Sequence, residues 1–152
     1  MMENITYGVA VKSDIPCLVN LLSSLFNIEK DFSADATKQK KGLELLINNE
    51  STATIKVARN TEGKVVGMVT AQLVISTAQG TPSAWIEDMV VDTLYRGHGI
   101  GKQLLQEAIA WSKENGASRA QLLVDIANSE ALAYYQHLEW QSTQLQARRI
   151  FI

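Results

Sequence analysis

A glycine-rich turn between an apolar strand and an amphipathic helix constrains this chain more than any other feature. The turn is Arg96-Gly97-His98-Gly99-Ile100-Gly101, and an apolar helical stripe begins at Leu104. Glycines allow backbone N–H groups to converge on one point, and the following helix adds the positive end of its dipole. Each glycine loses more conformational entropy on folding than other residues do, so three alternate glycines are unfavourable in a turn that only connects two elements. The turn therefore predicts a strand, a phosphate-binding turn and a helix in succession.

The two common nucleotide-binding motifs do not fit this turn. A P-loop would require glycine at position 96 and serine or threonine at position 103, where Arg96 and Gln103 stand. A dinucleotide fingerprint would require glycine at position 102 or 104, where Lys102 and Leu104 stand. The expected phosphate therefore belongs to a different kind of ligand.

Charge and composition exclude several other classes of protein. Lysine and arginine number 14 against 16 aspartate and glutamate, which gives a net charge of −2, whereas nucleic-acid binders usually carry a basic stripe. One cysteine, Cys17 in an apolar run, and two histidines argue against a disulfide framework and a metal site. Residues 1–7 lack the pattern of a secretory signal, and polar residues interrupt the longest uncharged stretch, 65–85. We expect a soluble, cytoplasmic protein that contacts neither membrane nor nucleic acid.

The hydrophobic periodicity predicts one α/β domain over residues 1–152, with a mixed sheet. Ser13 or Asp14 is expected to cap the first helix, and Asn115-Gly116 to end the helix after the glycine turn. The segment 27–41 is polar, and we expect it to be mobile before a short helix. The expected order is a strand (5–12), helices (16–26 and about 43–47), three strands (54–58, 65–75, 84–92), a helix (from 101), a strand (120–124), a helix (129–138) and two short strands around Gln146-Ala147.

Three motifs in this order resemble the GNAT superfamily of N-acetyltransferases. The turn matches the superfamily's pyrophosphate loop, Q/R-x-x-G-x-G/A, at Arg96, Gly99 and Gly101. Residues 85–91 resemble its central strand, and residues 128–138 resemble its second motif, N-x-x-A followed by an aromatic residue and tyrosine. One departure is Glu139-Trp140, where the superfamily commonly has glycine and an aromatic residue, so the turn there is expected to differ. The Glu87-Asp88 pair is most similar to the diamine and thialysine acetyltransferase branch.

The resemblance implies a mixed, mostly antiparallel central sheet flanked by helices, and acetyl-CoA as co-substrate with no metal. It places the backbone of the central strand along the pantetheine arm and the acetyl carbonyl, and the glycine turn on the pyrophosphate. Asn128 is expected both to cap the last helix and to approach the pantetheine. The implied coenzyme-binding residues are Met89, Val90, Val91, Arg96, Gly97, His98, Gly99, Ile100, Gly101, Lys102, Asn128 and Ala131.

Acetyl transfer to an amine needs a proton acceptor and a proton donor. An aliphatic ammonium must lose a proton before it attacks, and Glu87 and Asp88 are the candidates to accept it. Neighbours on a strand point to opposite faces, so only one can face the thioester, and the branch resemblance favours Glu87. The resemblance gives Tyr135 the role of acid toward the departing thiolate, and Tyr134 is then expected to pack.

The leading hypothesis is an N-acetyltransferase that moves the acetyl group directly to a primary amine of a small molecule or peptide in a ternary complex. The alternatives are an acyl-CoA-binding sensor without turnover and an unrelated nucleotide-binding interaction domain. The acceptor is open, although Glu29, Asp31 and Asp35 would border its pocket by resemblance and would suit a polyamine, a lysine analogue or an aminoglycoside. A homodimer through the C-terminal strands would fit the habit of the superfamily. We expect Trp111 and Trp140 to pack, and Arg148-Arg149 to be solvated or paired.

Overall fold

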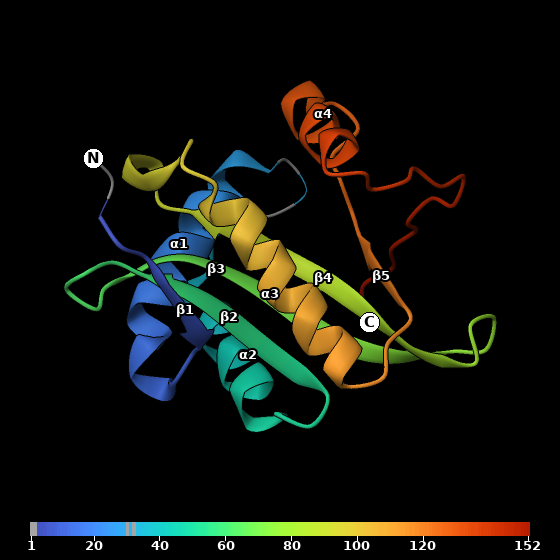
Figure 1. The fold of residues 1–152 in the computed structure, drawn as a ribbon, viewed down its shortest axis with the longest axis horizontal. Helices are drawn as coiled ribbons and strands as arrows, with labels where there is room; N and C mark the ends of the chain where they lie inside the picture. The colour runs from blue at the N-terminus through green and yellow to red at the C-terminus, as the bar shows by residue number, and fades with distance from the viewer. Residues whose placement is uncertain (1–2, 30, 32) are drawn as a thin grey trace.

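The computed structural model describes residues 3–29, 31 and 33–152, which form a five-stranded sheet in the order β1-β2-β3-β4-β5 (Figure 1). Strands β4 and β5 are parallel and all other neighbours are antiparallel, which confirms the predicted mixed, mostly antiparallel sheet. The elements are β1 (Thr6–Val9), η1 (Lys12–Asp14), α1 (Ile15–Ile28), α2 (Ala36–Asn48), β2 (Ala53–Arg59), β3 (Val65–Ser76), β4 (Thr81–Val91), η2 (Thr93–Tyr95), α3 (Ile100–Glu114), β5 (Arg119–Leu122) and α4 (Ser129–His137).

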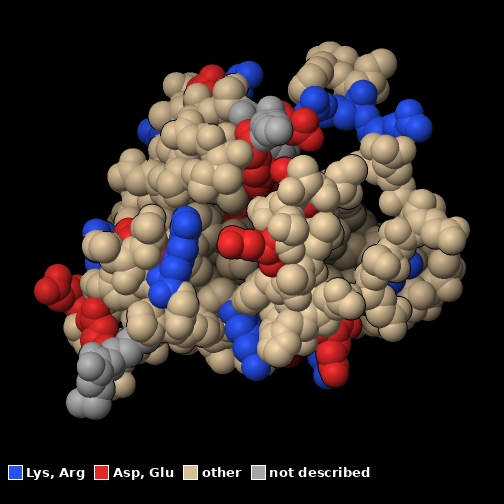
Figure 2. Space-filling view, turned by 90° about the horizontal axis from the view of Figure 1, so that it is seen from above, with Lys and Arg blue, Asp and Glu red and all other residues tan. Residues whose placement is uncertain are grey.

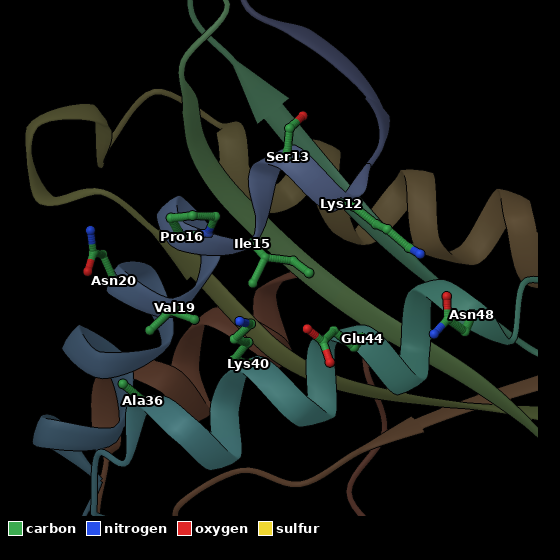
Figure 3. A pocket seen from close by; sticks show the side chains of 10 residues that line it. All are labelled: Lys12, Ser13, Ile15, Pro16, Val19, Asn20, Ala36, Lys40, Glu44 and Asn48. Carbon is green, nitrogen blue, oxygen red and sulfur yellow. The ribbon is translucent and has the colours of Figure 1, made fainter.

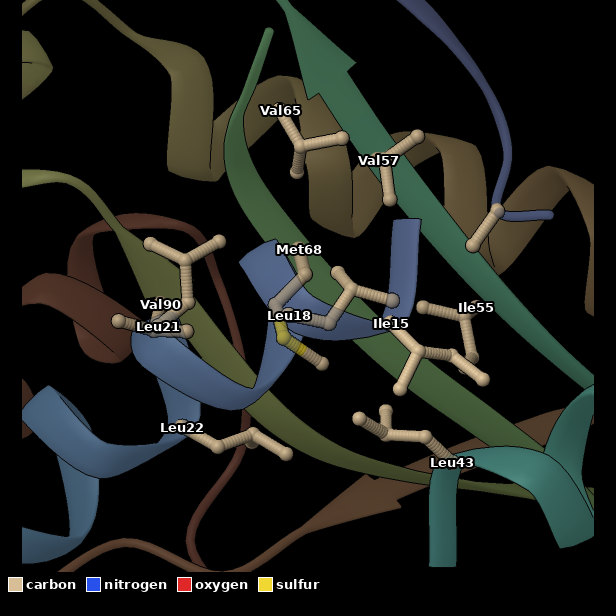
Figure 4. Packing of buried hydrophobic residues seen from close by; sticks show 11 residues of the cluster. Ile15, Leu18, Leu21, Leu22, Leu43, Ile55, Val57, Val65, Met68 and Val90 are labelled. Carbon is tan, nitrogen blue, oxygen red and sulfur yellow. The ribbon is translucent and has the colours of Figure 1, made fainter. Parts of the chain in front are cut away.

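Two apolar layers hold helices on opposite faces of the sheet. Helices α1 and α2 pack on one face, where Leu18 and Leu43 meet Met68 and Val90 of the sheet (Figure 4). Helix α3 packs on the other face, where Leu104 and its neighbours contact the opposite side of β3 and β4. Burial of large side chains in both layers supplies the main driving force for folding, about 25 cal/mol per Å² of apolar surface.

The start of α1 is fixed to the sheet by an ion pair. Asp14 lies at the N-cap position of α1, and its carboxylate accepts hydrogen bonds from Arg59 of β2 at 2.7 and 2.8 Å. The same carboxylate accepts the Val11 N–H at 2.8 Å. Asp14 is 8% exposed, so the pair is largely shielded from water. Of the two expected caps, Asp14 occupies the N-cap position, but its carboxylate bonds to Val11 and Arg59 and accepts no N–H group of α1.

Helix α2 begins earlier than its apolar residues predict. It starts at Ala36, inside the segment 27–41 that was expected to be a polar connection. Asp35 caps it by accepting the Lys38 N–H, and Gln39 reaches back to accept the Asp35 N–H at 2.7 Å. This reciprocal capping compensates for a polar first turn. Residues 30 and 32 of the expected segment lie outside the described residues.

The prediction of two short strands near Gln146-Ala147 is wrong. Residues 140–152 contain no strand, and Leu145 and Phe151 are more than 80% exposed. An apolar, β-prone sequence becomes a strand only where it pairs with a neighbouring strand, and residues 140–152 do not pair with the free edge of β5 or with any other described strand.

None of the described helices is both long and apolar enough to span a bilayer. The longest, α3, has 15 residues, whereas a span needs about 20 apolar ones.

Candidate active site

The glycine-rich turn leads directly into α3. Gly97 and Gly99 both have a φ of 81°, a left-handed conformation that favours glycine, and Gly99 is the N-cap of the helix. The first helical hydrogen bond runs from the Gln103 N–H to the Gly99 carbonyl oxygen at 3.1 Å. The N–H groups of residues 100–102 precede that bond and have no intrahelical acceptor. They and the helix dipole can bind an anion such as a phosphate.

The side chains of the turn have different roles. Arg96 connects the turn to the end of β4. Its Nε donates a hydrogen bond to the Val91 carbonyl oxygen at 3.0 Å. Ile100 is 2% exposed and belongs to the core, so only its backbone is available to a ligand. His98 and Lys102 are exposed, and the Lys102 ammonium stands at the positive end of the helix, where a bound phosphate would offset the repulsion.

Strand β4 has an open edge beside this turn. Its pairing with β5 ends at Ile86, and no described strand pairs with that edge over the rest of β4, to Val91. The next residue, Asp92, donates its N–H to Val66 of β3 at 2.8 Å. Because successive N–H groups of a strand point to opposite sides, those of Met89 and Val91 point away from β3. Strand β5 diverges from β4 here and leads to α4 (Figure 1), which leaves the outward N–H groups of β4 without a described strand partner.

A bulge interrupts β4 where this open edge begins. The β3 residues Met68 and Thr70 are two apart, whereas their partners Val90 and Glu87 are three apart. Asp88 has a φ of 53°, which is unusual for a residue other than glycine. The bulge re-aims the side chains around it, as bulges next to active sites often do.

Acidic side chains from two further segments, the end of α1 and the segment after β5, lie near the bulge. Burial and the carboxylates of Glu87 and Glu29 raise the pKa of Asp88 to about 7. Burial, together with the charges of Asp125, Asp31 and Glu87, also raises the pKa of Glu29 at the end of α1. Figure 2 shows Asp and Glu side chains gathered in the middle of the face seen from above. The site is therefore an electronegative region that favours a bound cation.

Glu87 is exposed and is held by an aromatic neighbour. The indole N–H of Trp85, two residues earlier on the same strand face, donates to one carboxylate oxygen of Glu87. Thr70 of β3 donates to the Glu87 carbonyl oxygen at 3.1 Å. Both contacts fix the orientation of this part of β4.

The two tyrosines of α4 face different surroundings. A Cβ on Gly101 would stand 3.2 Å from the Tyr134 hydroxyl oxygen, so this ring packs α4 against the first turn of α3. Tyr135 stacks edge-on against Tyr134 and Trp140, with ring centroids 5.4 and 6.0 Å apart. Burial, then the nearby Tyr134 and Glu29, raises the pKa of Tyr135 to about 12, so its hydroxyl stays protonated at neutral pH.

A large groove lies elsewhere on the molecule. It has a volume of about 880 Å³ and runs between the start of α1 and the outer side of α2 (Figure 3). Its described lining includes Lys12, Asn20, Lys40 and Glu44, and none of the predicted site residues. In the described part of the chain, no three His, Cys, Asp or Glu side chains are arranged to hold a metal ion.

A family model described as "Acetyltransferase (GNAT) family" matches residues 19–140. The chain belongs to the GNAT family. A solved GNAT-like structure, a possible acetyltransferase from Clostridium difficile 630, superposes with a TM-score of 0.86 at 20% identity and covers 99% of both chains. That similarity concerns the fold.

Two curated relatives match shorter segments. An uncharacterized N-acetyltransferase from Methanocaldococcus jannaschii is 32% identical over 84 residues, which are 55% of this chain and 37% of that protein. A glucosamine 6-phosphate N-acetyltransferase from Trypanosoma brucei brucei is 33% identical over 89 residues, which are 57% of each chain. The match therefore spans less than two thirds of either relative.

Most residues predicted from the GNAT motifs gather around the open edge of β4. The glycine turn, the 89–91 backbone and α4 meet there, with Asn128 capping α4 through the Ala131 N–H at 3.0 Å. Asp35 instead caps α2. Sequence patterns alone do not single out Trp85 or Asp125. Trp85 could have been found from its position two residues before Glu87, whereas nothing local links Asp125 to Glu29.

Proposed function

We propose that this GNAT-family chain is an acetyl-CoA-dependent N-acetyltransferase. In this proposal it transfers the acetyl group directly to a primary amine of a small molecule or peptide within a ternary complex. The observation that carries the proposal is the junction of three features: the glycine turn at the start of α3, the open edge of β4 and the acidic region beside it. In this proposal the glycine turn binds a phosphate, the open edge of β4 binds an extended arm, and the acidic region binds an amine.

The turn and the strand edge support coenzyme A as the ligand. The N–H groups of residues 100–102 would bind the pyrophosphate, with Lys102 and His98 exposed beside it. The outward N–H groups of Met89 and Val91 would pair with the pantetheine arm or the acetyl carbonyl oxygen. Asn128 and Ala131 would approach the same arm, although the Asn128 side-chain oxygen already caps α4.

The acceptor amine must reach this site and lose a proton. Its ammonium would be attracted by Glu87, Asp88 and Glu29. The motif resemblance assigns the proton-accepting role to Glu87, and that assignment remains a proposal. The amine nitrogen then attacks the thioester carbonyl carbon, the C–N bond forms, and the C–S bond breaks with its electron pair on sulfur.

Tyr135 is the proposed donor to the departing thiolate. A phenol with a pKa of about 12 is a weaker acid than a thiol near 8.5, so proton transfer from it alone is unfavourable. The transfer becomes favourable when the nitrogen, positively charged after attack, releases its second proton to the phenolate in the same step. Tyr135 therefore acts as a relay between nitrogen and sulfur.

The acidic region supports a cationic acceptor. Glu87, Asp88, Glu29 and Asp125 contribute negative charge near one point, which would repel the phosphate of an acceptor such as glucosamine 6-phosphate. We therefore place the acceptor among amines without a phosphate group. A homodimer also remains a proposal, in which the exposed C-terminal segment finds its partner on a second copy.

The test is thiol release from acetyl-CoA with a panel of amines, while the concentrations of both substrates are varied. Intersecting initial-rate lines are expected for at least one amine, because both substrates must be bound before reaction. Parallel lines would contradict direct transfer. Tight acetyl-CoA binding without thiol release for any amine would favour the alternative, an acyl-CoA-binding sensor.

A further inference from the structure

Asp88 is the residue inserted by the β4 bulge. Before the bulge, Ile86 packs on the α3 face of the sheet, and after it Met89 and Val91 pack on that same face. Val90 packs on the opposite face, against α1. Regular alternation from Ile86 would put Met89 and Val91 on the α1 face, so one extra residue has been accommodated. Asp88, with its positive φ, is that residue.

The position of Asp88 serves neither apolar layer. It belongs to neither cluster of buried hydrophobic residues, and it sits where the pairing of β4 with β5 has just ended. A positive φ is uncommon at a residue other than glycine, and backbone of this kind concentrates at functional sites. The bulge therefore places a partly buried carboxylate at the point of β4 where pairing with β5 has just ended, within electrostatic reach of Glu29 at the end of α1.

Among the described residues, the charged groups that act on Asp88 are carboxylates. Glu87 acts on it from the same strand, and Glu29 acts on it from the end of α1. Asp125, after β5, and Asp31, after α1, act on Glu29 in turn, and Glu29 acts on Tyr135 of α4. Burial and this negative field raise the pKa of Asp88 to about 7, near the value that suits a base working at neutral pH.

Glu87 is arranged differently. Its carboxylate is exposed, and one of its two oxygens accepts the Trp85 indole N–H. This geometry suits a group that holds an ammonium in place more than a group that removes its proton.

We infer that Asp88, rather than Glu87, accepts the proton of the acceptor ammonium, and that Glu87 positions the ammonium. This inference rests on the proposed acetyltransferase function. The proton moves from nitrogen to the Asp88 carboxylate, and the freed lone pair forms the C–N bond. The C–S bond breaks, the thiolate gains its proton through Tyr135, and Asp88 releases its proton to solvent before the next turnover.

The experiment compares Asp88→Asn with Glu87→Gln. Asparagine tolerates a positive φ, so Asp88→Asn should retain the bulge. We expect Asp88→Asn to lower kcat by 10² to 10⁴ with unchanged acetyl-CoA affinity, and to abolish the rise of kcat/KM with pH near 7. Glu87→Gln should mainly raise the KM of the amine and keep that rise, with its midpoint at lower pH because the charge of Glu87 no longer raises the pKa of Asp88.

A second measurement separates proton removal from a structural role. An alkoxyamine analogue of the best acceptor is neutral at pH 7 and needs no base, so Asp88→Asn should use it at nearly the wild-type rate. An equal defect with both acceptors, or a matching loss of acetyl-CoA affinity measured by calorimetry, would overturn the inference. So would wild-type turnover in Asp88→Asn, or loss of the pH-dependent rise in Glu87→Gln instead. Each of these results would overturn the role of Asp88 without contradicting the proposed acetyltransferase function. If the wild-type protein releases no thiol with any amine, both the role of Asp88 and the acetyltransferase function are contradicted.

Discussion

The Tyr134 hydroxyl lies against Gly101, where an added Cβ would be only 3.2 Å away. This contact joins α4 to the first turn of α3 and directs Tyr134 toward the glycine turn. Tyr135, about 100° further round the helix, shares its surroundings with Glu29 instead. Two adjacent tyrosines therefore have separable roles.

Replacing each tyrosine by phenylalanine tests this separation. Tyr135→Phe removes only the proposed relay hydroxyl, so turnover should fall roughly 10² to 10⁴-fold while acetyl-CoA affinity changes little. Tyr134→Phe keeps the ring that packs against α3 and should retain most of the turnover. Steady-state rates at saturating acetyl-CoA are the measurement. Reversed responses would move the relay role to Tyr134.

Substitution at Gly99 tests the phosphate site. A Cβ there meets no protein atom within 4 Å, and asparagine tolerates the φ of 81°, so Gly99→Asn should fold. Its side chain would obstruct a phosphate, and we expect at least a tenfold rise in the dissociation constant of acetyl-CoA, about 1.4 kcal/mol.

Gly63 provides a matched control for this substitution. It has the same φ of 81° and the same open surroundings, in the turn between β2 and β3. Gly63→Asn should leave acetyl-CoA affinity unchanged in calorimetry. Equal effects at Gly63 and Gly99 would exclude the proposed pyrophosphate site.

The Asp14–Arg59 pair should make stability pH-dependent. Hydrogen bonds from Arg59 lower the pKa of Asp14, so the pair stabilises the fold above the unfolded-state pKa near 3.9 and is lost as pH falls through the lower folded-state value. Asp14→Asn should cost about 2 kcal/mol in denaturant unfolding at pH 7, because the pair is mostly shielded. The difference from wild type should shrink below pH 4. A difference that stays constant down to pH 2 would contradict the assignment.

Glu139 offers a test of local strain. It follows α4 with a φ of 69°, the left-handed conformation that favours glycine, at the position where the sequence departs from the GNAT pattern. The turn therefore uses a glycine-like conformation without glycine. Glu139→Gly should raise stability by about 0.5 to 1 kcal/mol, whereas Glu130→Gly, inside α4, should lower it by about 1 kcal/mol. Thermal melts would detect both changes.

Local signals predicted most of the fold. Asp14, Asn115-Gly116 and Asn128 are helix-end residues whose effect depends on a few neighbours, and each lies at the predicted helix end. The signal for the β2–β3 hairpin is equally local, because the turn residues 60–63 separate the two predicted strands 54–58 and 65–75. The hydrophobic pattern does not predict the start of α2, because the first turn of this helix is polar. The start is fixed by hydrogen bonds of the N-cap residue Asp35, one of them to Gln39.

Features that depend on distant partners could not be predicted in the same way. The bulge at Asp88 is defined by the register against β3, and the acidic region joins Glu29 to Asp125 across almost a hundred residues. The C-terminal segment has strand-like residues, but strand formation requires a partner edge that the sequence does not specify.

The most direct test of the account is the mass of the products after incubation with acetyl-CoA that carries a deuterated acetyl group. The account predicts that one amine of the panel gains one labelled acetyl group for each thiol released, and that the protein mass is unchanged when the amine is left out. The account would be contradicted if no amine gained the label while bound acetyl-CoA stayed intact. It would also be contradicted if the protein itself gained the label in the absence of an amine.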